Sequence, residues 1–225
     1  MPCGVAGAAA GPFGAHGGSG LSSIGGSIRL GELLSDTGPI RHALKIEVNN
    51  FWYYGRKALN PKTDYNGGRT QYLWPATGSN SGCCPGSYNG TEPYVAPGAL
   101  LAIPASDANQ VNTTTVIGHK IKSAMIDYGA YLVDGTGPTS HGPPHANKAA
   151  ICMDALVNDE MRRHYGFAMT YPDGVSPSDP EDKGAALYWD LLHIFRHLQA
   201  VVNNGPHSVG GGGTPRVPTK PPICA

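Results

Sequence analysis

The stretch from Ile40 to Tyr54 constrains the fold of this chain more than any other part of the sequence. It reads IRHALKIEVNNFWYY. Leu44, Ile46 and Val48 follow His42 at every second position, and successive side chains of a strand point to opposite faces. We therefore predict a half-buried strand here, with these four side chains on its apolar face.

The opposite face of this strand is ionic, and we place a candidate site on it. Arg41, Lys45 and Glu47 share that face, and the aromatic residues Phe51, Trp52, Tyr53 and Tyr54 follow directly. Aromatic rings beside carboxylates and cations are typical of a groove that holds a polysaccharide. The same pattern also suits an exposed strand face with ordinary cross-strand ion pairs.

The other apolar patterns predict strands mostly in the first half of the chain and helices in the second. We therefore predict an α+β fold with an antiparallel, jelly-roll-like β-sandwich and two or three helices in the C-terminal half. A single domain over 21–202 lies between a Gly-rich coil (1–20) and a Gly/Pro-rich tail (203–225). The predicted strands are 27–34, which forms a hairpin with the central strand, 99–103 and 130–134, and the predicted helices are 115–128, 153–165 and 180–202.

Composition narrows the class of partner. Charged residues make up 14% of the 225 residues, and 16 basic side chains balance 16 acidic ones. A nucleic-acid-binding face would need a basic excess, so we predict no such partner. No apolar run approaches the length that a membrane span requires.

Cysteines and glycosylation signals favour export from the cell. The sequons at Asn89 and Asn112 lie in polar, turn-like segments where a glycan can attach. The first 20 residues do not form a signal peptide, so either the chain is a fragment or a mature form, or the argument for export is wrong. Five cysteines without zinc-finger spacing predict disulfides and one thiol that is free or paired between chains; they are Cys3, Cys83, Cys84, Cys152 and Cys224.

Four segments resemble a family of secreted bacterial proteins. They are GSGLSSIGGSIRLGEL (18–33), IRHAL (40–44), DYGAYLVDGTG (127–137) and NNGPHSVGGGGTPR (203–216). The family pattern is G-L-x-x-x-G-G-x-I-R-x-x-E-L, then I-R-H-A-L, then Y-G-A-Y-x-V-D. The resemblance covers most of the chain from Gly17 onward. It implies secretion and a β-rich core, and it supplies no mechanism.

The candidate catalytic residues are Arg41, His42, Glu47, Tyr131 and Asp134. A glycosidase needs two carboxylates at a defined separation, which Glu47 with Asp134, or Glu32 with Asp134, can supply. His42 is either a general base or a core histidine hydrogen-bonded to Asp134 or Glu32. Asp134, at a strand end before a glycine, also suits a turn or a calcium ligand.

The candidate substrate-binding residues are Trp52, Tyr53, Tyr54, Trp74 and Lys45. The aromatic ones suit stacking on sugar rings, and they equally suit a core or loop-anchoring role. No metal-binding motif stands out, so we predict no metal site and no cofactor, and a structural calcium has no support.

We predict a secreted, extracellular, carbohydrate-active protein, a hydrolase or lyase that acts on a polysaccharide over the Arg41, Lys45 and Glu47 face. The alternative is a non-catalytic structural glycoprotein subunit that assembles as a homo-oligomer or polymer through its tails or a free cysteine. A glycan-binding module is a further option.

Overall fold

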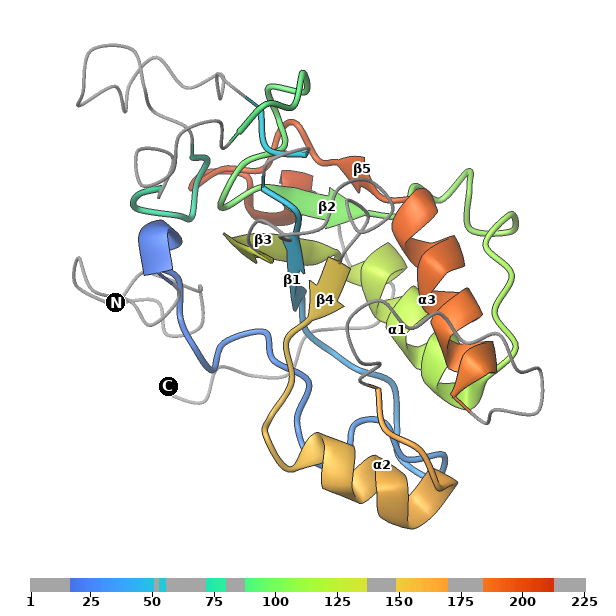
Figure 1. Cartoon of the computed structure of the whole chain (residues 1–225). Helices are drawn as coiled ribbons and strands as arrows, with labels where there is room; N and C mark the ends of the chain where they lie inside the picture. The colour runs from blue at the N-terminus through green and yellow to red at the C-terminus, as the bar shows by residue number, and fades with distance from the viewer. Residues whose placement is uncertain are drawn as a thin grey trace.

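A mixed sheet with helices packed on one side forms the centre of this computed structural model (Figure 1). The structure describes residues 17–50, 53–55, 72–79, 88–136, 149–169 and 184–212. Its strands are β1 (Leu44–Val48), β2 (Leu100–Ala102), β3 (Ala130–Gly135), β4 (Ala149–Ile151) and β5 (Gln199–Ala200). Its helices are α1 (Val116–Asp127), α2 (Val157–Tyr165) and α3 (Ala185–Arg196), with short 3-10 turns η1 (Gly17–Ser19) and η3 (Val209–Gly212).

The described strands form one open sheet in the order β4-β1-β3-β2-β5. The central pair, β1 and β3, is parallel, whereas the other three pairings are antiparallel. The α+β class is confirmed. The predicted sandwich is not seen, because the described part of the chain contains no second sheet and helices cover the apolar face instead.

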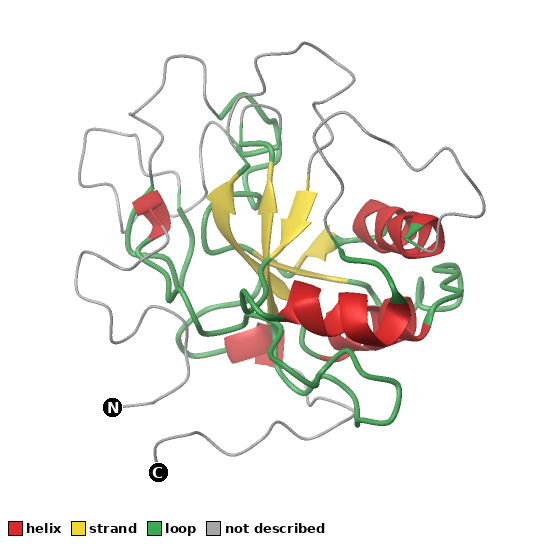
Figure 2. Cartoon of the chain, turned by 60° about the horizontal axis from the view of Figure 1, so that its bottom comes forward, coloured by secondary structure: helices red, strands yellow, loops and turns green. Residues whose placement is uncertain are grey.

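The alternation in β1 correctly predicts the face that meets the helices, but the strand is not half-buried, because Lys45 on the opposite face is buried as well. Leu44 and Ile46 are fully buried and join the main core with side chains of all three helices, among them Ile121, Met161 and Ile194. Figure 2 shows the strands at the centre with the helices beside and below them. Because the helices take up this face, the residues that pack on the other face come mainly from loops.

Helix α1 begins and ends where its local sequence dictates. The Thr115 hydroxyl accepts a hydrogen bond from the Gly118 N–H at 2.9 Å and so caps the first turn. Gly129 follows the helix with a φ of +70°, and a side chain there would collide with β2. The chain then turns straight into β3, which lies alongside β1.

Several predicted helix and strand boundaries differ from the structure, because contacts between distant segments decide the local conformation there. Residues 27–34 form turns, apart from a bridge between Ile28 and Met153, because the Glu160 carboxylate accepts hydrogen bonds from the Gly31 N–H. Helix α2 begins four residues later than predicted, and α3 ends at Arg196, where the chain turns into β5. Strand β4 was not predicted at all.

Candidate functional site

Two carboxylates meet at neighbouring positions of the central parallel strands. Glu47 of β1 pairs with Asp134 of β3, and the register shifts by one residue just before this pair. Without that irregularity Val133 would lie opposite Glu47. Both acids are partly exposed, and they lie near the carboxyl ends of their strands, where ligands of parallel sheets usually bind.

Backbone contacts hold Asp134 in place. Its Oδ1 accepts a hydrogen bond from the Gly135 N–H at 2.8 Å, and its backbone carbonyl accepts one from the Tyr54 hydroxyl at 2.6 Å. Tyr54 itself is fully buried and packs edge-on against Tyr88 with ring centroids 4.9 Å apart. The predicted stacking role of Tyr54 is therefore wrong, because its ring is not accessible and its hydroxyl positions the strand that carries Asp134.

The environment of Glu47 raises the pKa of its carboxyl above the ordinary value. Burial raises the pKa of the Glu47 carboxyl, and the negative charge of Asp134 raises it further. A hydrogen bond from Cys152 and the charge of Lys45 act in the opposite direction without cancelling the rise. A carboxyl with a raised pKa beside a second carboxyl is an arrangement that can supply an acid and a base.

Lys45 lies on the same face of β1 but is 1% exposed. Its Nζ donates hydrogen bonds to the backbone carbonyls of Ser22, at 3.0 Å, and Ser23, at 2.6 Å. Gly26, with a φ of +80°, lets this loop lie against the lysine stem, because a Cβ there would come within 2.8 Å of Lys45 Cγ. The predicted open ionic face is therefore covered at Lys45, which cannot contact a substrate.

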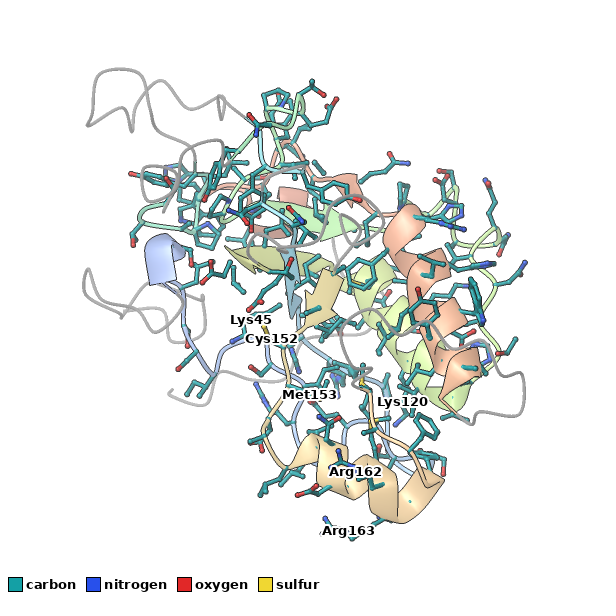
Figure 3. The ribbon with its side chains drawn as sticks, viewed as in Figure 1. Lys45, Lys120, Cys152, Met153, Arg162 and Arg163 are labelled. Atoms are coloured by element: carbon teal, nitrogen blue, oxygen red, sulfur yellow. The ribbon has the colours of Figure 1, made fainter. Side chains whose placement is uncertain are left out.

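Cys152 adjoins the carboxylate pair from the β4 side. Figure 3 shows it beside Lys45, and its backbone N–H donates to the Lys45 carbonyl at 3.0 Å. Its Sγ lies 3.7 Å from Glu47 Oε1. Burial raises the pKa of this thiol to about 11, and the charge of Glu47 contributes. The thiol therefore stays protonated at neutral pH and donates to Glu47, so it is not an activated nucleophile. Sequence reasoning gave Cys152 no place in the site, since its neighbours come from β1.

Arg41 and His42 lie at the other end of β1 from the carboxylate pair. His42 Nε2 lies 3.1 Å from Glu32 Oε2, and His42 Nδ1 lies 2.9 Å from the Ala43 carbonyl oxygen. The predicted partnership with Glu32 is confirmed. Arg41 hydrogen-bonds the Tyr128 side chain there. Neither side chain is brought together with Glu47 and Asp134, because an extended strand places residues five positions apart about 16 Å from each other.

The remaining predicted residues lie in different surroundings. Tyr131 is buried in register with Lys45, and its hydroxyl lies 3.4 Å from Asn204 Oδ1. Tyr53 is exposed, and Trp52 lies outside the described residues. Trp74 lines a cavity of about 260 Å³ beside β2.

No group of three His, Cys, Asp or Glu side chains in the described part of the chain is arranged to hold a metal ion. Within the same residues, no helix combines the length and apolar character that a bilayer crossing needs. No protein-family model, curated protein or solved structure matches this chain.

Proposed function

We propose that the chain is a secreted glycoside hydrolase in which Glu47 is the general acid and Asp134 the carboxylate base or nucleophile. The observation that carries this proposal is the register that sets Glu47 opposite Asp134 on β1 and β3. Glu47, with its raised pKa, donates a proton to the glycosidic oxygen, and the leaving sugar departs as an alcohol.

The strand spacing favours a retaining mechanism. Neighbouring strands lie about 4.8 Å apart, and retaining glycosidases hold their carboxyl groups about 5–5.5 Å apart, whereas inverting ones need roughly 6.5–9.5 Å. Asp134 then attacks the anomeric carbon and forms a glycosyl ester. Water, deprotonated by Glu47, hydrolyses that ester and regenerates both groups.

Hydrolysis is favoured over a lyase reaction by the surroundings of the cations. A lyase must neutralise the carboxylate of a uronate, which needs an accessible positive side chain near the base. Lys45 is buried beneath residues 22–23, and Arg41 lies at the opposite end of β1. The supported substrate is therefore a polysaccharide whose cleaved linkage does not depend on uronate recognition.

Export of the protein is part of the same proposal. Asn89 and Asn112, the asparagines of the two sequons, are both exposed, so a glycan at either position would extend into solvent. The predicted assembly through the tails concerns residues 1–20 and 203–225, of which 1–16 and 213–225 lie outside the described residues. Residues 203–212, which belong to the predicted tail, contact the body of the protein through hydrogen bonds of Asn204 with Trp74 and Tyr131.

The test is the release of reducing ends from a panel of polysaccharides by the purified chain and its variants. Glu47→Gln and Asp134→Asn should each lower the rate by about 10²–10⁴-fold, whereas Glu92→Gln, at an exposed site, should leave it unchanged. NMR of the first product should show retained anomeric configuration. An inactive wild-type protein across the panel, or a fully active Glu47→Gln variant, would refute the proposal.

A further inference from the structure

A cavity of about 260 Å³ lies on the other side of β3 from Glu47, beside β2. Its walls come from loop 72–79, from the segment before β2 and from the chain after β5. Figure 1 shows the teal loop near the red segment that follows β5. The lining residues are Leu73, Trp74, Tyr94, Gly98, Ala99, Leu100, Val201, Val202, Asn204, Gly205 and Pro206.

The cavity is built by backbone contacts between segments distant in sequence. The Leu73 N–H donates to the Pro97 carbonyl at 2.8 Å, and Gly98 has a φ of +89° that brings the backbone against Leu73. Any side chain at Gly98 would collide with the Leu73 carbonyl and with Ala76. These contacts hold the backbone of the loop that carries Trp74 against the segment before β2.

Asn204 ties the cavity to the sheet. Its Nδ2 donates to the Trp74 carbonyl at 3.4 Å, and its Oδ1 accepts hydrogen bonds from the Gly210 N–H at 2.9 Å and the Tyr131 hydroxyl at 3.4 Å. Tyr131 lies in register with Lys45 of β1. The cavity and the strands of the carboxylate pair are therefore joined through one hydrogen-bonded side chain.

The chemistry of the lining selects a neutral, ring-shaped ligand. Trp74 and Tyr94 are the aromatic residues of the lining, and Val202 and Pro206 are among its aliphatic ones. None of the described residues that line the cavity is charged, so a charged ligand would lose its hydration without compensation. The lining surface is mixed polar and apolar, and the Tyr94 hydroxyl is a polar group of the kind that orients a ligand.

The volume limits the ligand to a single ring. Sites for drug-sized molecules span roughly 300–1,000 Å³, and this cavity lies just below that range. We propose that it binds one neutral sugar ring by stacking on Trp74 and Tyr94, as a subsite for a terminal or branching residue of the polysaccharide. The choice of a sugar rests on the proposed function, whereas neutrality and size follow from the lining.

The test is binding of neutral monosaccharides and short neutral oligosaccharides, measured by isothermal titration calorimetry, with galacturonate as the charged comparison. Wild-type protein should bind a neutral sugar weakly and galacturonate at least tenfold more weakly. Trp74→Ala should weaken the neutral sugar at least tenfold, and Trp189→Ala, which removes an exposed tryptophan on α3, should leave it unchanged.

A second variant covers the case in which Trp74→Ala does not fold. Val202 is 60% exposed at the cavity, so Val202→Trp should block the cavity without disturbing the core, and sugar binding should fall at least tenfold. Binding that survives in Val202→Trp or in a folded Trp74→Ala variant overturns the inference, as does the absence of binding by any neutral sugar.

The inference and the proposed function fail separately. Glu47→Gln should keep sugar binding in the cavity while it loses hydrolysis. Hydrolysis without binding in this cavity would overturn the subsite alone, whereas binding in a wild-type protein that hydrolyses nothing would overturn the hydrolase proposal alone.

Discussion

Asp190 of α3 holds the start of α1 together with the cap at Thr115, and its removal gives the sharpest test of the fold. The carboxylate is 3% exposed. Its oxygens accept hydrogen bonds from the backbone N–H groups of Thr114 and Thr115, both at 2.8 Å, and from their hydroxyls at 3.2 and 2.7 Å. Gly118 leaves the space that the carboxylate occupies. A buried charge is tolerated here because four donors surround it.

The loss of folding stability on truncation of Asp190 to alanine can be worked out from these contacts. Each hydrogen bond to a charged group contributes about 1.5 kcal/mol at the lower end of the usual range, so two backbone bonds give about 3 kcal/mol for Asp190→Ala. The two hydroxyls add little, since Thr114 is exposed and Thr115 partly exposed, and water can replace their partner. Asp190→Asn keeps one acceptor oxygen but turns an amide nitrogen toward two donors, so about 2 kcal/mol should be lost.

Urea unfolding monitored by circular dichroism, under reducing conditions, measures these losses. A loss of 3 kcal/mol in the free energy of unfolding corresponds to a melting temperature roughly 6–12 °C lower in a chain of this size. The matched control is Asp159→Ala on α2, whose pair with Arg162 spans 2.8 Å with both side chains 57% exposed; it should change stability by less than about 1 kcal/mol. A loss below about 1 kcal/mol for Asp190→Ala, or an equal loss in the control, would refute the reasoning.

Two further predictions concern titratable groups. Burial alone would raise the pKa of Glu32, but hydrogen bonds from His42 and the Arg29 N–H hold it below its ordinary value of 4.5. This carboxylate therefore stabilises the folded protein above about pH 4.5, and the contribution is lost as the pH falls through the lowered pKa. In urea unfolding measured between acidic and neutral pH, the free energy of unfolding should fall less steeply toward acid in Glu32→Gln than in the wild type. An equal dependence on pH in the two proteins would contradict this. Because the pKa of Cys152 is about 11, roughly one thiol in a thousand is ionised at pH 8. Iodoacetamide should therefore modify Cys152 far more slowly in the native protein than in urea, as measured by peptide mass spectrometry. Equal rates would count against the buried environment.

Local sequence predicts those parts of the fold whose physical cause is local. The two-residue period of Leu44, Ile46 and Val48 predicts a strand and places these side chains on one face, because successive side chains of a strand point to opposite faces. Helix α1 follows from its apolar period, the cap at Thr115 and the glycine after it. These features depend on residues within a few positions of one another.

The candidate site depends instead on contacts between distant segments. Glu47 and Asp134 were both candidates from sequence, but nothing local says that β1 runs parallel to β3 or that the register shifts by one residue between them. The same holds for Lys45, which alternation assigns to an open face and which residues 22–23 cover.

The chain alone thus determined that β1 is a strand, which of its side chains share the face toward the main core and which acids stand near strand ends. Tertiary structure decided that Glu47 meets Asp134, that Lys45 is withdrawn from solvent and that Trp74 lines a cavity. The physical reason is that side-chain period and capping act over a few residues, whereas strand partners and loop cover are chosen by hydrogen bonds and packing between segments far apart in sequence.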